Sequence, residues 1–236
     1  MWSGPRNLST ALMRSWGSRG DTVVWDEPLY AHWLKVTGCQ YHPGWQETLE
    51  QHESDWRKVV EKVLGPVPAG KRVFYQKHMA HHLLPEIDRG WTRQVENCFL
   101  IRSPEEMLTS LAEFVPEPRI EDTGLPQQVE LFEETCARTG KVPPVVDSEN
   151  IAARPREVLT QLCDKLGVPF DEAMLSWKPG LRETDGAWAP YWYNKVAQTT
   201  GFSVERPPKR PLPEKLAPLL EKCVALHDRM AEHRLN

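Results

Sequence analysis

A short loop near the start of the chain is suited to binding phosphate. Residues 3–10 read Ser-Gly-Pro-Arg-Asn-Leu-Ser-Thr, and the segment TALMRSW that overlaps its end has the composition of a helix. Such a turn brings free backbone N–H groups to the positive end of a helix dipole, and Arg6, Asn7, Ser9 and Thr10 would add side-chain donors. A capped helix start, with Ser9 or Asn7 as the N-cap, explains the same pattern without a ligand.

The loop differs from the nucleotide-binding loop of kinases and GTPases. It lacks the G-x-x-x-x-G-K-[ST] pattern that such loops carry. The pattern therefore favours a phosphorylated donor whose chemistry proceeds without a bound metal.

A second pair of residues is suited to binding a compact anion. Arg102 follows the apolar run Val95–Ile101, and Ser110 lies eight residues later in the segment PEEMLTSLAEF, where Pro104 suits the first turn of a helix. An arginine at the end of a strand and a serine two turns into the next helix can converge on one group.

Short apolar runs that precede helical stretches predict the elements that position these residues. The predicted strands are Thr22–Trp25, Arg72–Gln76, Val95–Ile101 and Pro144–Asp147, and the predicted helices include Glu47–Leu64, Gln127–Thr139, Arg156–Leu166 and Pro213–Leu235. This alternation is typical of an α/β protein with a parallel sheet. Regular periodicity fades between Trp177 and Pro213, which indicates long loops.

Three histidines follow the predicted strand Arg72–Gln76, in the segment YQKHMAHHLLP. His78, His81 and His82 raise the possibility of a metal site, but no carboxylate or cysteine lies at ligand spacing, so a metal is not expected. For His81 and His82 the commoner explanation is the start of a helix with one ring packed and one facing solvent, and we prefer it for His81.

The two anion-binding motifs together resemble those of sulfotransferases. SGPRNLST is similar to the family's 5′-phosphosulfate loop, IRSPEEMLTS to its 3′-phosphate motif, and VVDSENIAARPREVLTQLCDKLGVPFDEAML to the strand, turn and helix that follow. The resemblance covers essentially the whole chain. It is closest to the bacterial group with a P-R-N-x-S-T loop, some of whose relatives are joined to branched-chain aminotransferase-like domains.

The resemblance implies a fold and a reaction. The fold would be a single sulfotransferase-like P-loop domain over residues 1–236, a parallel sheet with helices on both faces. The co-substrate would be 3′-phosphoadenosine 5′-phosphosulfate, without a metal. His78 would be the catalytic base, with Lys77 assisting and His81 and His82 as rivals, and Arg6 would stabilise charge on the leaving phosphate. The cofactor-binding set would be Arg6, Asn7, Ser9, Thr10, Arg102 and Ser110.

Two departures from the family pattern concern the phosphate loop. Only Met1 and Trp2 precede it, so the first strand is expected to be very short. The loop also carries Arg6 where many members have lysine and Leu8 where many have glycine, which bears on how closely a donor approaches the backbone.

The acceptor is not readable beyond a small molecule with a hydroxyl or amine. Aromatic residues could line an apolar or sugar pocket, although core packing is the commoner role, and Glu27 and His32 are weaker candidates for the acceptor side. The aromatic set is Trp25, Trp33, Trp45, Trp188, Trp192, Tyr191 and Tyr193.

Composition narrows the range of possible partners and locations of the protein. The 236 residues are 40% hydrophobic and 26% charged with a net charge of −4, which argues against a nucleic-acid or membrane partner, and a cytoplasmic location is expected. A nucleotide-dependent phosphotransferase and a non-catalytic nucleotide-binding module with the same fold remain as alternatives. The oligomeric state is not readable.

Overall fold

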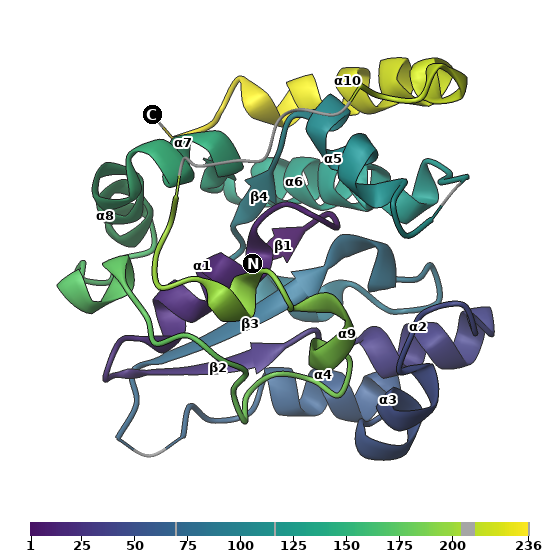
Figure 1. Ribbon diagram of the computed structural model, residues 1–236. Coiled ribbons are helices and arrows are strands. Elements are labelled where there is room, and N and C mark those ends of the chain that lie inside the picture. Colours follow the sequence, from purple (N-terminus) through teal and green to yellow (C-terminus); the bar gives the residue numbers. More distant parts are fainter. Residues whose placement is uncertain (69, 116, 204–210, 236) are drawn as a thin grey trace. The chain divides into compact units, whose positions relative to one another are not determined.

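The computed structural model describes residues 1–68, 70–115, 117–203 and 211–235, and they form two compact units. Unit 1 comprises residues 1–9, 97–170 and 202–236, and unit 2 comprises residues 10–96 and 171–201. Figure 1 shows helices alternating with strands along the chain. The named strand pairs are all parallel, which confirms the α/β class.

Unit 1 contains three parallel strands. β1 (Trp2–Ser3) pairs with β4 (Phe99–Ile101) in the register Trp2–Phe99, and β4 pairs with β5 (Val145–Asp147). The first strand is as short as expected. The helices of unit 1 are α5 (Pro104–Leu111), α6 (Leu125–Thr139), α7 (Ser148–Ala153), α8 (Pro155–Lys165) and α10 (Ala217–Ala231), with 3₁₀ turns at Glu121–Thr123 and Glu214–Leu216. β4 is fully buried, and α10 contacts α5 and α6.

Unit 2 contains two parallel strands. β2 (Thr22–Asp26) pairs with β3 (Val73–Met79), and the register sets Asp26 opposite Lys77. Its helices are α2 (Tyr30–Thr37), α3 (Trp45–Gln51), α4 (Trp56–Val63) and α9 (Ala189–Trp192), with 3₁₀ turns at Ala80–His82, Gly90–Gln94, Glu172–Leu175 and Val196–Gln198. Helix α1 (Ser9–Gly17) begins at the last residue of the first segment of unit 1.

Several element boundaries differ from the predicted ones. The predicted helix Glu47–Leu64 is two helices, because the side chain of Asp55 accepts a hydrogen bond from the Arg57 amide and caps a new helix there. The predicted strand Val95–Ile101 is shortened to β4, because a 3₁₀ turn ends at Gln94 and the chain pairs only from Phe99. The last helix ends at Ala231, four residues early.

No helix in the described part of the chain is long and apolar enough to span a bilayer.

Candidate active site

The phosphate loop connects β1 to α1 and has a strained backbone. Arg6 and Leu8 have φ angles of 63° and 66°, in the left-handed region that side-chain-bearing residues rarely adopt. Each such residue costs about 1–2 kcal/mol, and strain of this kind concentrates at binding sites. Leu8, where many family members have glycine, therefore adopts the conformation that glycine adopts freely.

Buried amides hold the loop against the strands of unit 1. Gln128 of α6 donates from Nε2 to the carbonyl oxygens of Trp2 (3.2 Å) and Leu100 (3.1 Å), and Asn7 donates from Nδ2 to the same Leu100 oxygen (3.3 Å). A Cβ at Gly4 would lie 2.5 Å from the carbonyl oxygen of Thr123, so only glycine fits there. Asn7 is buried, so its side chain supports the loop from within.

Ser9 and Thr10 are the first two residues of α1. Ser9 is buried and Thr10 is half-buried. The position of both hydroxyls at the helix start agrees with the predicted element.

Arg6, Arg102 and Ser110 form one cluster in unit 1. Arg6 donates from Nε to the Ser110 hydroxyl (3.0 Å), and Arg102 donates from Nη1 to the backbone carbonyl of Arg6 (2.6 Å). The guanidinium of Arg6 also lies over the ring of Phe114, 4.8 Å from its centroid. The sequence assigned Arg6 to one anion site and the other two residues to another, but the fold brings all three together.

Two positively charged side chains, Arg6 and Arg102, lie close together in the cluster. Arg102 forms an ion pair with Glu106, one helical turn further along α5, with Nη2 to Oε2 at 3.1 Å. The pKa of Arg6 is lowered, mainly by burial and also by Arg102, while Glu113 opposes the shift. Two guanidinium groups held this close are stabilised by an incoming anion. Glu106 was missed by sequence reasoning, although its four-residue spacing from Arg102 is a usable signal.

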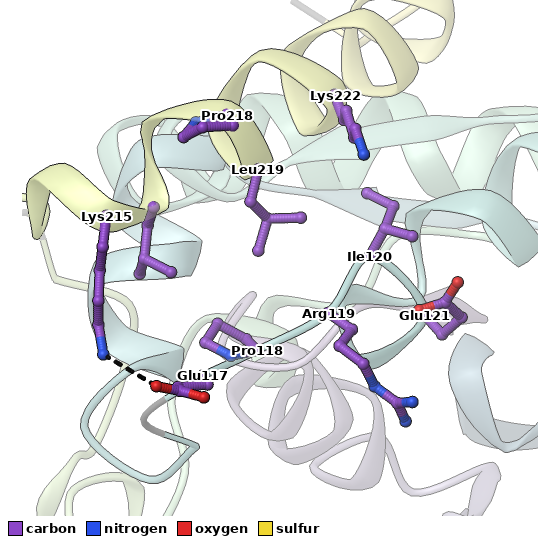
Figure 2. Close-up of a pocket in the computed structure, with 10 residues that line it drawn as sticks. Glu117, Pro118, Arg119, Ile120, Glu121, Lys215, Pro218, Leu219 and Lys222 are labelled. Atoms are coloured by element: carbon purple, nitrogen blue, oxygen red, sulfur yellow. Dashed lines mark ion pairs between the residues drawn. The ribbon is translucent and has the colours of Figure 1, made fainter.

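A separate groove lies elsewhere in unit 1, between the loop at residues 117–121 and the start of α10. Figure 2 shows Leu219 and Ile120 at its centre and an ion pair from Lys215 to Glu117 (3.7 Å) at one end. Its volume is about 620 Å³. The described residues that line it are Glu117, Pro118, Arg119, Ile120, Glu121, Lys215, Leu216, Pro218, Leu219 and Lys222, which do not include the predicted donor-binding residues.

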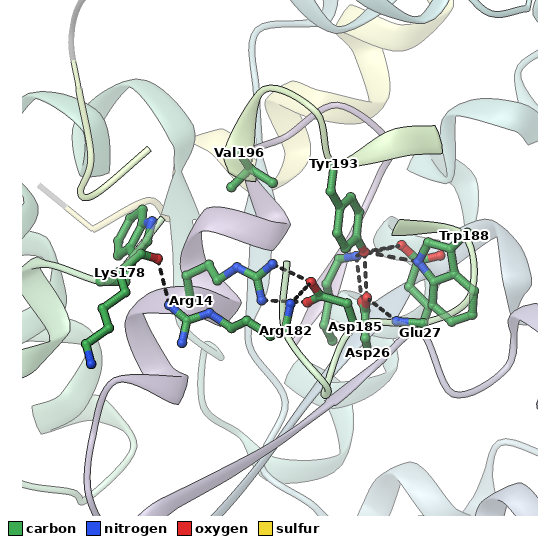
Figure 3. Close-up of polar contacts among 12 residues, drawn as sticks. Arg14, Asp26, Glu27, Lys178, Arg182, Asp185, Trp188, Tyr193 and Val196 are labelled. Carbon is green, nitrogen blue, oxygen red and sulfur yellow. Dashed lines mark hydrogen bonds and ion pairs between the residues drawn. The ribbon is translucent and has the colours of Figure 1, made fainter. Parts of the chain in front are cut away.

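Unit 2 contains a buried charged network around Lys77. Its ammonium donates to Asp26 Oδ1 (2.9 Å), Glu27 Oε1 (2.5 Å) and the Tyr193 hydroxyl (2.8 Å). Figure 3 labels Asp26, Glu27 and Tyr193 of this network. An ammonium has three N–H donors, so these three acceptors use all of them. The Tyr193 hydroxyl in turn donates to Asp26 Oδ2 (2.6 Å) and accepts from Trp188 Nε1 (3.1 Å).

A second buried ion pair ties the loop at residues 178–188 to α1 within unit 2. Arg14 and Asp185 form two hydrogen bonds of 2.5 Å, and each side chain is only 2% exposed. The next residue, Gly186, donates from its backbone amide to Asp26 Oδ2 (3.4 Å). Sequence reasoning missed Arg14, Asp26 and Asp185, because a single buried charge gives no signal of where its partner lies.

Burial dominates His78, which lies within β3 and not after it as predicted, and the two histidines that follow the strand, His81 and His82. His78 is 3% exposed, and its ring packs against Trp91 with a centroid distance of 5.5 Å. Burial lowers the pKa of His78 and His82 well below the usual value and lowers that of His81 to about 3. His82 is buried and His81 is partly exposed. No group of His, Cys, Asp or Glu side chains in the described ranges is arranged to hold a metal ion.

Glu27, a weaker candidate from the sequence, combines several features of a functional residue. It directly follows β2 and has a φ of 40°, which is strained for a non-glycine residue. Its side chain is 11% exposed, whereas those of Asp26 and Lys77 are 1% exposed. Burial raises the pKa of Glu27 against the opposing effect of Lys77, and its Oε2 lies 4.0 Å from His82 Nδ1.

Most of the aromatic candidates for the acceptor side belong to the core of unit 2. Trp33, Trp188 and Tyr193 are buried in one cluster with Tyr30, and Trp45 and Trp192 pack against it. Trp25 stacks on Phe74, and Tyr191 is exposed. His32 is buried with Nε2 3.3 Å from Glu86 Oε1.

Comparison with known proteins identifies the family. A family model described as "Sulfotransferase domain" matches residues 1–232. Branched-chain-amino-acid aminotransferase-like proteins 1 and 2 of Arabidopsis thaliana are 37% and 34% identical over 232 residues, which is 98% of this chain but 41% of each relative. The chain therefore spans well under half of the length of these relatives.

A solved structure supports the same fold. The sulfotransferase domain of the Synechococcus PCC 7002 olefin synthase has a TM-score of 0.51 with 18% identity, covering 98% of this chain and 92% of that one. The resemblance of the two anion-binding motifs is thus confirmed at the level of the family, and this chain belongs to the sulfotransferase domain family.

Proposed function

We propose that the protein is a sulfotransferase that moves a sulfuryl group from 3′-phosphoadenosine 5′-phosphosulfate to a hydroxyl or amine of a small-molecule acceptor. The observation that carries the proposal is the convergence of Arg6, Arg102 and Ser110 in unit 1. Two guanidinium groups and a hydroxyl match the chemistry of a phosphate monoester, which takes several charge-assisted hydrogen bonds. We further propose that both units belong to one domain, since the family match includes segments of each.

The phosphate loop would bind the 5′ end of the donor. Backbone N–H groups at the start of α1, with the hydroxyls of Ser9 and Thr10, are suited to the 5′-phosphosulfate. In the reaction, the acceptor oxygen or nitrogen forms a bond to sulfur while the bond from sulfur to the bridging oxygen of the 5′-phosphate breaks. The same donors would stabilise the negative charge that develops on the leaving phosphate.

The acceptor proton must pass to a base, and Glu27 fits this task better than His78. His78 is almost fully enclosed and its pKa is far below neutral, which makes it a weak base. Glu27 is more accessible, and a raised carboxyl pKa brings it nearer to the working pH. Lys77 would then act by orienting Glu27, because its three N–H donors are already occupied.

Calorimetric binding of adenosine 3′,5′-bisphosphate and ADP tests donor recognition without knowledge of the acceptor. We expect the bisphosphate to bind at least 10-fold more tightly than ADP, and Arg102→Ala to abolish most of that preference. Arg119→Ala is the control, because Arg119 is an exposed arginine of the same unit. Equal binding of the two nucleotides would favour a phosphotransferase, and no binding of either would overturn the proposal.

A binding module without turnover would give the same calorimetry. Release of adenosine 3′,5′-bisphosphate from the sulfated donor separates the two functions, because only an enzyme produces it. We also propose a cytoplasmic location and no nucleic-acid or membrane partner, in keeping with the net charge of −4. Fractionation of cells that produce the protein tests the location.

A further inference from the structure

We propose that His82 is a positioning residue for the catalytic base: its Nδ1–H donates a hydrogen bond to Glu27 Oε2 and holds that oxygen in place to take the acceptor's proton. The inference rests on the proposed function and on Glu27 as its base, and it adds a residue that acts through Glu27. Both residues lie in unit 2.

The two carboxylate oxygens of Glu27 have different surroundings. Oε1 accepts a hydrogen bond from Lys77 Nζ at 2.5 Å and lies 3.4 Å from the Tyr193 hydroxyl. Oε2 accepts no hydrogen bond from any residue that the structure describes, and His82 Nδ1 lies 4.0 Å from it. Because Oε1 is already bound, Oε2 is the oxygen that is free to accept a proton.

The ring of His82 is held next to Glu27 by the helix that follows that residue. His82 ends the 3₁₀ turn after β3, and its side chain is 2% exposed. The ring stacks on Tyr30 of α2 with a centroid distance of 4.7 Å and an interplanar angle of 8°, and it lies 5.3 Å from the ring of Trp33. The amide of Tyr30 donates to the Glu27 carbonyl oxygen at 3.0 Å. The stacking therefore restricts rotation of the ring away from Glu27.

The Nδ1 atom of His82 is enclosed and has no hydrogen-bond partner among the described residues. A buried polar atom without a partner is unfavourable, and the distance of 4.0 Å to Glu27 Oε2 exceeds a hydrogen bond by about 1 Å. Hydrogen bonds of catalytic groups are often this long before a substrate binds and shorten afterwards. An ionised carboxylate only accepts hydrogen bonds, so the tautomer that it attracts is the one with the proton on Nδ1.

The charges around the pair keep the ring of His82 neutral. Burial lowers the pKa of His82 well below its usual value, and neighbouring cationic or ionisable groups lower it further. These groups are His81, His42, Lys77 and His78. Glu27 is faced by Lys77, Asp26 and Tyr193 as well as by His82. Near neutral pH, a change of rate with pH therefore reports the ionisation of Glu27 and not that of His82.

Two amide substitutions of His82 test this role. An Asn side chain places its amide near the position of Nδ1, and a Gln side chain places it near that of Nε2, while both remove the stacked ring. The measurement is the rate at which adenosine 3′,5′-bisphosphate is released from the sulfated donor, over a range of pH. We expect His82→Asn to stay within about 5-fold of the wild type and His82→Gln to lose about 10- to 100-fold.

The pH dependence gives a second readout. The rate rises with pH as Glu27 ionises, and loss of a donor to the ionised form raises the pKa of that carboxyl. The midpoint should therefore move up by about 1 pH unit in His82→Gln and stay unchanged in His82→Asn. Calorimetric binding of adenosine 3′,5′-bisphosphate should be the same in both variants, and the unfolding midpoint of each shows that it is folded.

The same substitution in the Glu27→Gln variant separates positioning from a structural role. If His82 acts through Glu27, adding His82→Gln should lower the residual rate less than about 3-fold. A residue that only supports the fold would reduce the rate by the same factor in both backgrounds.

The possible results also separate this inference from the proposed function. Equal rate losses in His82→Asn and His82→Gln, or an undiminished loss in the Glu27→Gln background, would overturn the inference and leave the proposed function standing. A wild-type rate in Glu27→Gln would remove the base on which the inference depends, again without affecting the sulfotransferase assignment. If the wild type releases no adenosine 3′,5′-bisphosphate, the proposed function fails, and the inference fails with it.

Discussion

The two charged clusters differ in how completely their N–H donors are occupied and in how far they are buried. In unit 1, Arg102 donates to the Arg6 carbonyl and is paired with Glu106, and the Arg102 side chain is 19% exposed. In unit 2, every N–H of Lys77 has an acceptor, and the Lys77–Asp26 pair is 1% exposed.

This difference supports the proposal that the cluster of unit 1 binds a ligand and that the network of unit 2 holds the fold together. A cluster with spare donors and partly exposed cations can still gain energy from a ligand, whereas a saturated, buried network can only lose energy when it is disturbed. Glu27 is the exception in unit 2, because it belongs to the network but retains some exposure. The contrast therefore predicts that variants of Arg6, Arg102 and Ser110 change affinity, and that variants of the buried ion pairs of unit 2 change stability, apart from Glu27.

The largest expected effect concerns the catalytic base. Glu27→Gln should lower the rate of donor cleavage about 100- to 10,000-fold, and His78→Asn less than about 10-fold, because only Glu27 combines access with a raised pKa. The measurement is release of adenosine 3′,5′-bisphosphate with water as the acceptor. The wild-type rate should rise with pH through a value above the usual glutamate pKa, since the base must be ionised.

Binding of adenosine 3′,5′-bisphosphate should be unchanged in Glu27→Gln, which serves as the control for folding. A larger loss of the cleavage rate in His78→Asn than in Glu27→Gln would show that His78, and not Glu27, is the catalytic base.

The next effect concerns stability within unit 2. Arg14→Ala leaves Asp185 buried without its bidentate partner and should reduce the free energy of unfolding by about 3–5 kcal/mol. Arg154→Ala, which removes an exposed pair with Glu157, should change it by about 0–1 kcal/mol. Urea unfolding measures both. Similar losses in the two variants would show that the buried Arg14–Asp185 pair contributes no more to stability than an exposed ion pair does.

A smaller effect concerns acid sensitivity. The folded-state pKa of His81, about 3, lies below its unfolded value, so its contribution to stability is complete above pH 6.5 and is lost as the pH falls toward 3. Between pH 7 and pH 5 the loss should be about 1–2 kcal/mol. Urea unfolding of His81→Gln at both pH values should show a shallower dependence than the wild type. An identical dependence would mean that the ring is not held neutral.

The smallest effect concerns loop strain in unit 1. Leu8→Gly should stabilise the protein by up to about 1 kcal/mol, because glycine adopts the left-handed conformation without strain but loses more chain entropy on folding. Gly4→Ala should destabilise it, because the new Cβ would lie 2.5 Å from the Thr123 carbonyl oxygen. Thermal unfolding compares the pair. A destabilised Leu8→Gly would show that the Leu8 side chain contributes more than its strained backbone costs.

Much of the fold was predictable because its signals are local. Apolar periodicity and capping residues predict the helix after the phosphate loop, the helix that starts at Pro104 and most of the strand Val73–Met79. The prediction was wrong where a local hydrogen bond interrupts a continuous pattern. Asp55 caps a new helix and so divides one amphipathic pattern into two helices. The same local reading cannot say which of several nearby histidines is accessible, and burial makes His78 a weaker candidate than the sequence suggested.

By itself, the sequence determined the α/β class and the family, and it predicted two anion-binding motifs, because each of these depends on residues close together along the chain. Only the tertiary structure decided that Arg6 meets Ser110, 104 residues away, and that Lys77 is bonded to Tyr193, 116 residues away. The physical reason is that a side-chain hydrogen bond acts over about 3 Å, so its partner depends on how distant segments pack and not on the spacing of residues in sequence.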